Sequence, residues 1–161
     1  MMVELARLQR TEELVKLRHI AKICGLSNNY LGQLAISLKD DGLVIGVSGK
    51  KGGYKLARMP EEISLHQIIR AVQGPLAATA CAVNPNLCLN AEFCEARTIW
   101  VLISEKIQEV LEGYTLADLI EKRWMSRVKQ ENPDSKFLDI STLIKSGSEF
   151  STGGCQNQRT E

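Results

Sequence analysis

The sequence has no hydrophobic run long enough to cross a membrane, because such a helix needs roughly 18 to 20 consecutive apolar residues. Its first ten residues, MMVELARLQR, also lack the apolar stretch of a secretory signal peptide. These two absences predict a soluble, cytoplasmic protein. With 161 residues, of which 44% are hydrophobic, the chain is long enough to bury one core of ordinary size, so one principal domain is expected.

The chain also lacks the short motifs that accompany common enzyme chemistry. It contains no phosphate-cradling GxxxxGKS/T loop, no nucleophile elbow and only two histidines, which form no paired metal motif. A redox enzyme built on its cysteines would need a CxxC pair, which is absent, or a large pocket. The sequence therefore predicts that the protein is not an enzyme, with a redox enzyme as the weaker alternative.

The net charge of +1 hides an uneven distribution of charged residues. Residues 1–60 carry ten lysines and arginines against five acidic residues, whereas residues 61–161 carry ten against fourteen. A basic first third followed by an acidic remainder is typical of a DNA-binding head on a neutral or acidic body. A solvated basic face is the simpler alternative, and charge alone does not separate the two.

Two short helices joined by a tight turn are predicted in this basic region. Residues 17–24 (LRHIAKIC) carry apolar side chains at helical spacing, Gly25 and Leu26 interrupt the pattern, and Ser27 is a good N-cap for a helix over residues 28–39. This is the helix-turn-helix pattern, whose second helix enters the major groove. Many helical hairpins look alike, so a purely structural pair stays open. The predicted DNA-binding residues of the second helix are Ser27, Asn28, Asn29, Tyr30 and Gln33.

A glycine-rich hairpin is predicted directly after these helices. Residues 43–47 have the pattern of one strand and residues 54–57 that of its returning partner. The tip between them, SGKKGG, can approach a phosphate backbone closely and supplies two positive charges, as a wing in the minor groove requires. Its predicted DNA-binding residues are Lys50, Lys51, Gly52 and Gly53. The alternative is a solvated hairpin without a partner.

The stretch GLSNNYLGQLAISLKDDGLVIGVSGKKGGYKLARMPEEISLHQIIRAVQGPL resembles the Rrf2 family of winged-helix regulators, which includes the iron-sulfur regulator IscR and the nitric-oxide sensor NsrR. The similarity runs from about Met2 to Ile120 and includes the PEEISL and TLADLI segments. The resemblance implies a mainly α fold with a small β-hairpin, in which a winged helix-turn-helix is followed by a long dimerisation helix. It also implies a homodimer on a palindromic operator in double-stranded DNA.

Two positions depart from the family pattern. The segment MMVELA resembles only the C-terminal part of the family's first helix, so we expect a shortened N-terminal helix that lacks roughly three turns. Gly32 stands where many relatives have a glutamate that influences base choice. The operator preference of relatives is therefore not carried over to this chain.

Three of the five cysteines, Cys81, Cys88 and Cys94, lie within fourteen residues, whereas Cys24 falls in a helical segment and Cys155 in a polar tail. Structural disulfides are not expected, because the cytosol keeps thiols reduced. The gaps of six and five residues are too long for a tight zinc knuckle, but a loop with this spacing can wrap three thiolates around an iron-sulfur cluster. Free thiols that pack as small hydrophobes, or a metal-free redox switch, are the alternatives.

The cysteine spacing resembles that of the cluster-binding branch of the family, which implies an iron-sulfur cluster, 2Fe-2S rather than 4Fe-4S. Such a cluster takes four ligands. In relatives the fourth is a histidine a few residues after the third cysteine, or an acid or histidine of the first helix. Here Arg97 stands three residues beyond Cys94. The open candidates are Glu92, Glu95, a residue of the partner subunit, or an exogenous thiol or water.

A long helix with surplus apolar surface is predicted over residues 96–111, which suggests a dimer interface, although a core helix is the simpler interpretation. Thr115 is expected to cap a last short helix over residues 116–122. The expected organisation is a DNA-binding domain at 1–76, a sensor loop at 77–95, the dimerisation and short C-terminal helices at 96–124, and a flexible tail at 125–161.

The expected function is a homodimeric repressor or dual regulator that senses redox state, nitric oxide or iron-sulfur status through Cys81, Cys88 and Cys94. The alternative is a metal-free regulator of the same family that responds to thiol oxidation or to a small ligand.

Overall fold

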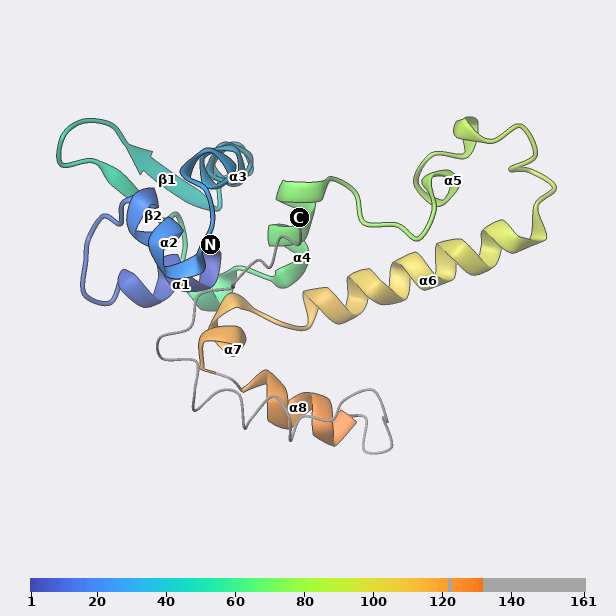
Figure 1. Ribbon diagram of the computed structural model, residues 1–161. Helices are drawn as coiled ribbons and strands as arrows, with labels where there is room; N and C mark the ends of the chain where they lie inside the picture. Colours follow the sequence, from blue (N-terminus) through green and yellow to red (C-terminus); the bar gives the residue numbers. More distant parts are fainter. Residues whose placement is uncertain (122, 132–161) are drawn as a thin grey trace, which may run out of the picture.

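The computed structural model describes residues 1–121 and 123–131, which form a head of short helices with one hairpin and a long helix that projects from it (Figure 1). The two strands are the described part's only sheet. This confirms the predicted mainly helical fold with a small hairpin. The elements are α1 (Met2–Leu8), α2 (Leu17–Cys24), α3 (Asn28–Asp40), β1 (Val44–Val47), β2 (Gly53–Leu56), η1 (Pro60–Glu62), α4 (Leu65–Gln73), α5 (Ala80–Val83), η2 (Pro85–Leu87), α6 (Glu95–Glu112), α7 (Leu116–Ile120) and α8 (Trp124–Glu131).

Helices α2 and α3 meet at the turn that the sequence predicted. Gly25 ends α2 in the left-handed conformation, with φ of 65°, and its N–H donates to the carbonyl of Ala21. A glycine adopts this conformation without the steric cost that a Cβ would bring. The Ser27 side chain then accepts a hydrogen bond from the Tyr30 backbone N–H at 3.1 Å, which caps α3.

The hairpin pairs β1 with β2 in antiparallel register, with Val44 opposite Leu56 and Val47 opposite Gly53. Val15, from the loop between α1 and α2, adds two backbone hydrogen bonds to Tyr54, at 2.9 and 2.8 Å. These bonds tie the hairpin to the segment that leads into α2. The orientation of the wing relative to the two helices is therefore fixed by backbone contacts as well as by side-chain packing.

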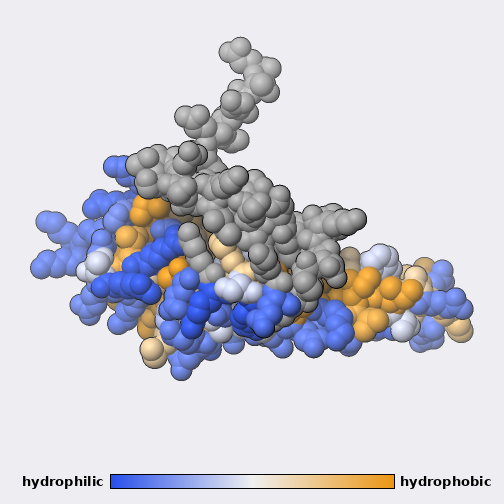
Figure 2. Space-filling model, turned by 90° about the horizontal axis from the view of Figure 1, so that it is seen from below, coloured by the Kyte–Doolittle hydropathy of each residue, from blue (hydrophilic) through white to orange (hydrophobic). Residues whose placement is uncertain are grey.

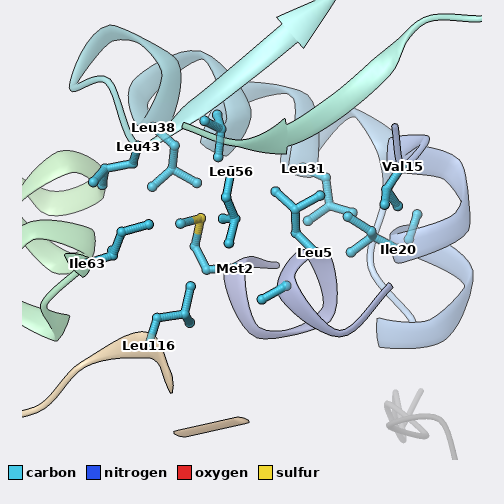
Figure 3. Close-up of a cluster of buried hydrophobic side chains, with 13 residues drawn as sticks. Met2, Leu5, Val15, Ile20, Leu31, Leu38, Leu43, Leu56, Ile63 and Leu116 are labelled. Atoms are coloured by element: carbon cyan, nitrogen blue, oxygen red, sulfur yellow. The ribbon is translucent and has the colours of Figure 1, made fainter. Parts of the chain in front are cut away.

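One hydrophobic core joins the first helix of the chain to α7 (Figure 3). Helix α1 supplies Met2 and Leu5, while Leu116 reaches the same core from α7, more than a hundred residues later. Burying such side chains is the main stabilising contribution to a domain of this size. The remaining members come from α1, α2, α3, the hairpin and the loops: Ala6, Val15, Ile20, Ala21, Leu31, Leu38, Leu43, Val44, Leu56 and Ile63.

Helix α6 is 18 residues long, or about 27 Å, and Figure 1 shows it extending from the head toward the loop that contains α5. Its C-terminal end is attached to the start of α4. The Leu65 N–H donates to the Tyr114 carbonyl at 2.9 Å, and the Leu116 N–H donates to the Ile63 carbonyl at 2.8 Å. The base of α6 is thereby fixed to the head.

The C-terminal part differs from the expectation. The short helix predicted over residues 116–122 is α7, which ends at Ile120 and is capped by Thr115 as expected. Where a flexible tail was expected from residue 125, the structure has helix α8, held by the guanidinium of Arg127, which lies 4.7 Å from the Tyr114 ring centroid and donates to the Gly113 carbonyl. These contacts join residues that are far apart in the sequence, Arg127 and Gly113 being 14 positions apart, so no local sequence pattern predicts α8. The rest of the expected tail, including Cys155, lies outside the described residues.

Candidate DNA interface and cysteine loop

The N-terminal turn of α3 presents the predicted base-contacting residues to solvent. Ser27, Asn28, Asn29, Tyr30 and Gln33 are all exposed. Within the described part of the chain, the side-chain amides of Asn28, Asn29 and Gln33 make no hydrogen bond, so they are available to the edges of bases. The Ser27 hydroxyl already accepts the capping hydrogen bond.

The wing tip exposes both predicted lysines, Lys50 and Lys51. Gly49 turns the chain with φ of 114°, and its carbonyl accepts a hydrogen bond from Gly52 N–H at 2.9 Å. A Cβ at Gly52 would overlap the carbonyl oxygen of Val47. This glycine therefore closes the tight turn that holds the two lysines at the tip.

Gly53 was predicted to contact DNA at the wing tip, but it lies in the strand at the base of the wing. It is buried in β2, and a Cβ on it would lie 2.8 Å from the Val15 carbonyl oxygen. The structure thus gives Gly53 a packing role at the base of the wing. Gly32, in contrast, has no atom within 4 Å of its missing Cβ and faces open space on α3.

Lys16, the N-cap residue of α2, lies against the wing and was not predicted from the sequence. Its ammonium group donates to the carbonyl of Lys50 at 3.4 Å, which places a third positive charge beside the two tip lysines. Lys16 immediately precedes α2 and has no neighbour in the sequence that marks it as part of the wing. Only the pairing of Val15 with Tyr54 brings it there.

The three clustered cysteines lie on three successive short segments at the far end of α6. Cys81 is in α5, Cys88 follows η2, and Cys94 is the N-cap residue of α6. Cys81 and Cys94 are partly buried and Cys88 is exposed. The Arg97 Nε donates to the carbonyl of Cys81 at 3.1 Å, so the segments of the first and third cysteines are neighbours.

The donor set suits an iron-sulfur cluster in kind, because three thiols come from one loop and two of them start from adjacent segments. Among the described residues, however, no three cysteine, histidine or acidic side chains are gathered as a ready metal site. The three thiols would have to come closer together to hold one cluster. Arg97, three residues beyond Cys94, is engaged with the Cys81 carbonyl, and Glu92 and Glu95 are exposed.

The family is decided by comparison with known proteins. The sequence model of Rrf2, described as an iron-dependent transcriptional regulator, matches residues 1–122. The chain belongs to the Rrf2 family. It is 36% identical to the HTH-type transcriptional regulator CymR of Bacillus subtilis over 118 residues, covering 73% of this chain and 80% of CymR. It is 34% identical to IscR of Aliivibrio salmonicida over 122 residues, covering 75% of this chain and 72% of that protein.

Solved structures agree with the sequence comparison. CymR of B. subtilis, titled a global cysteine regulator, matches this Rrf2 chain with a TM-score of 0.59 at 33% identity, covering 75% of this chain and 88% of CymR. IscR of T. potens matches with a TM-score of 0.59 at 35% identity, covering 76% and 79%. The family assignment and the winged-helix fold predicted from the sequence are confirmed. The protein is a DNA-binding transcriptional regulator of this family.

Helix α6 of this Rrf2 regulator carries an apolar stripe that no described residue covers. Ile99, Ile103, Ile107 and Val110 recur at spacings of four, four and three, so they lie on one face, and all four are exposed. Figure 2 shows hydrophobic side chains gathered on the arm that α6 forms. In the described part of the chain, no helix is both long and apolar enough to span a membrane.

Proposed function

We propose that this Rrf2 regulator binds a palindromic operator as a homodimer, with the start of α3 in the major groove and the wing in the adjoining minor groove. The observation that carries the proposal is that two exposed features lie on the same head. One is the polar first turn of α3, around Asn28, and the other is the wing with lysines at its tip, which the Val15–Tyr54 bridge anchors to the head. Polar side chains at the start of a recognition helix can distinguish bases, and lysines on a wing neutralise phosphates. Such a protein acts in the cytoplasm.

The test is to enrich operator fragments from a pool of genomic DNA and to map the bound protein by footprinting. A symmetric dimer should protect two half-sites about 34–36 Å apart, centre to centre, or a multiple of that spacing. Protection of a single half-site, with no symmetry in the enriched sequences, would overturn the homodimeric arrangement.

We further propose that Cys81, Cys88 and Cys94 hold an iron-sulfur cluster as the signal-receiving site. The support is the donor set: three thiols on one loop, at the N-terminal end of helix α6, which leads back to the DNA-binding head. When bound, such a cluster supplies iron that oxygen or nitric oxide can attack and that can be lost. The protein's part is to hold the three thiolates on α5, after η2 and at the N-cap of α6.

Anaerobic absorbance spectra with iron and sulfide analysis test this proposal. The wild-type protein should absorb broadly between about 300 and 500 nm and contain about two to four irons per subunit. The variants Cys81→Ala, Cys88→Ala and Cys94→Ala should each lose both signals, whereas Cys24→Ala, outside the loop, should keep them. A colourless, iron-free wild-type protein would contradict the cluster.

A metal-free thiol switch is the second candidate, because the described residues assemble no metal site and because this chain is similar to CymR, the global cysteine regulator of B. subtilis. In that case operator affinity should change on oxidation of an iron-free protein and return on reduction. The variant Cys88→Ala should abolish this change, while Cys24→Ala should not. Equal affinities of the oxidised and reduced protein would exclude it.

A small-ligand switch has its own supporting feature, a cavity of about 630 Å³ between α1, β2, η1 and α7. Ligand pockets of about 300–1,000 Å³ are common. Two arginines, Arg10 and Arg58, lie in its wall. If this cavity receives the signal, the response of operator affinity should survive replacement of all three loop cysteines and disappear in Arg10→Ala.

A further inference from the structure

Three polar side chains of α6 hold the backbone of residues 76–81. The Arg97 Nε donates to the Cys81 carbonyl at 3.1 Å, the Ala78 N–H donates to Ser104 Oγ at 3.0 Å, and the Gln108 Nε2 donates to the Leu76 carbonyl at 2.8 Å. Positions 97, 104 and 108 are seven and four residues apart and therefore lie on one helical face. The held segment runs antiparallel to the helix. We call these three side chains the clamp.

Ser104 is the central member of the clamp and the only buried polar residue among the described residues, at 5% exposure. Its hydroxyl donates to the Trp100 carbonyl at 2.6 Å while accepting from the Ala78 N–H. The hydroxyl therefore uses both its donor and an acceptor lone pair. The hydrogen bond between the Ala78 N–H and Ser104 is part-buried, and breaking it would leave the buried Ser104 hydroxyl with one partner fewer, which costs free energy and favours this position of the segment.

The clamped segment directly connects the cysteine loop with the head. Its far end is Cys81, and its near end follows Gly74, which adopts a φ of 82° at the C-terminus of α4. Ile68 and Ala71 of α4 pack against the core of the head. Arg70 of α4 also forms an exposed ion pair with Asp41, the C-cap residue of α3, at 3.7 Å.

The clamp and the apolar stripe occupy different faces of α6. The base of the helix is also tied to α4, because His66 Nδ1 lies 3.2 Å from Glu112 Oε1. A displacement of Cys81 therefore has two outcomes. Either the clamp holds, so that α6 and α4 move with the loop, or the clamp breaks, and the loop moves independently of the head.

We propose that Ser104 and Gln108 are positioning residues that transmit the state of the cysteine loop to α4 and thereby to α3. The inference rests on the proposed function in one respect, that the signal arrives at this loop. Neither residue is a proposed metal ligand or DNA contact, and both act through the backbone that they hold. Coupling of this kind typically changes affinity by about 5- to 150-fold between two states.

The first experiment compares operator affinity in the cluster-loaded and metal-free states, using the enriched operator fragment. Wild type should show a ratio of about 5- to 150-fold between the two dissociation constants. In Ser104→Ala and in Gln108→Glu, which replaces a donor with an acceptor of similar shape, the ratio should fall below about twofold. Ser104→Thr keeps the hydroxyl and should retain the wild-type ratio, as should the matched control Glu105→Gln on the exposed side of α6.

If Ser104 and Gln108 had only a structural role, their variants would have lower thermal stability, but the ratio of the two dissociation constants would be unchanged. If wild type responds and both variants keep its ratio, the inference is overturned while the proposed function stands. Gln108 is only half-buried, so its variant gives a readout even where Ser104→Ala folds poorly.

A second experiment decides the matter if wild type shows no difference between loaded and metal-free states, which would contradict the proposed function. Amide hydrogen exchange of α4 is measured in metal-free protein before and after N-ethylmaleimide modifies the loop cysteines, in a background carrying Cys24→Ala and Cys155→Ala. We expect the modification to change the amide hydrogen exchange rates of α4 in the protein with an intact clamp and to leave them unchanged in the Ser104→Ala variant. Unchanged exchange in the intact clamp, or equal changes in both proteins, would overturn the inference.

Discussion

At the scale of single residues, the glycines of the head show how differently one residue type is used. Gly53 has no room for a side chain, because the Val15 carbonyl lies against its backbone, whereas Gly32 has open space around it in the interior of α3. Glycine in a helix is less favourable than alanine because it has more conformational freedom to lose on folding. The same substitution should therefore have opposite effects at these two positions.

We expect Gly53→Ala to lower the free energy of unfolding by about 1–3 kcal/mol, the usual range for inserting a methyl group into a packed site. Gly32→Ala should raise it by roughly 0.5–1 kcal/mol. Urea denaturation followed by circular dichroism measures both. Equal effects of the two substitutions would mean that the backbone at Gly53 is not packed as described.

Asp118 provides a pH test of the cap of α7. The Thr115 backbone N–H and hydroxyl each donate to Asp118 Oδ2 at 2.9 Å, and Arg123 and Arg127 lie nearby, so the pKa of Asp118 is held below its ordinary value of 3.8. A lowered folded-state pKa stabilises the protein fully above the unfolded value, and this contribution is lost as pH falls through the folded value.

Thermal stability should consequently fall as pH is lowered below about 4, and part of this fall should be missing in Asp118→Asn. The matched control is Glu105→Gln, whose carboxylate is exposed on α6. An Asp118→Asn variant with the same pH dependence as wild type would show that the cap does not depend on the ionised carboxylate.

Residues that act through local pattern were predictable from the sequence, and residues that act across the fold were not. The Ser27 cap and the lysines of the wing follow from neighbours within a few positions. Lys16 reaches the wing only through the pairing of Val15 with Tyr54, and Ser104 has meaning only beside Ala78, 26 residues earlier. No spacing rule within one helix indicates such a partner.

At the scale of elements, α3 and the wing form one structural unit, because β2 is fixed to the segment that leads into α2. Helices α2 and α3 and the hairpin were predicted because breakers and apolar periodicity mark them locally. The described α5, η2 and α8 were not predicted. They are short, and α8 depends on Arg127 contacts with Tyr114 and Gly113. The sequence indicated that the three cysteines belong together, but it did not indicate that their side chains are apart in the structure.

The lysine pair of the wing is testable through salt dependence. Lys50→Ala combined with Lys51→Ala should weaken operator binding and reduce the slope of log affinity against log salt by about two, one for each lost phosphate contact. Loss of bound iron should not accompany it, since the wing lies far along the molecule from the cysteine loop (Figure 1).

Filter-binding titrations at several salt concentrations measure this slope, with Lys106→Ala on α6 as the control for loss of positive charge elsewhere. If the double variant binds the operator with the affinity and slope of wild type, the wing is not in contact with phosphates.

At the scale of the whole molecule, α6 makes three kinds of contact. One face holds the loop segment through the clamp, the C-terminal end is anchored to α4, and another face exposes an apolar stripe. Exposed stripes of this kind usually mark an interaction surface. We expect a second copy of the chain to cover it, because a symmetric dimer would place two recognition helices at a fixed distance.

Replacing Ile103 and Ile107 by glutamate should therefore shift the protein from dimer to monomer, since charges on a buried apolar face are costly. Sedimentation velocity measures the shift, and operator affinity should fall with it. Glu105→Lys, on a different and exposed face of α6, is the control and should leave the dimer intact. A double variant that sediments as a dimer would place the interface elsewhere.

We propose that a signal received at the cysteine loop changes the affinity of this protein for DNA. The most direct test of this proposal is the dissociation constant for the enriched operator, measured on one anaerobic preparation before and after removal of iron and repeated with Cys88→Ala. We expect a change of about fivefold or more in wild type and none in the variant. Identical constants before and after removal, for a protein shown to have carried iron, would contradict it.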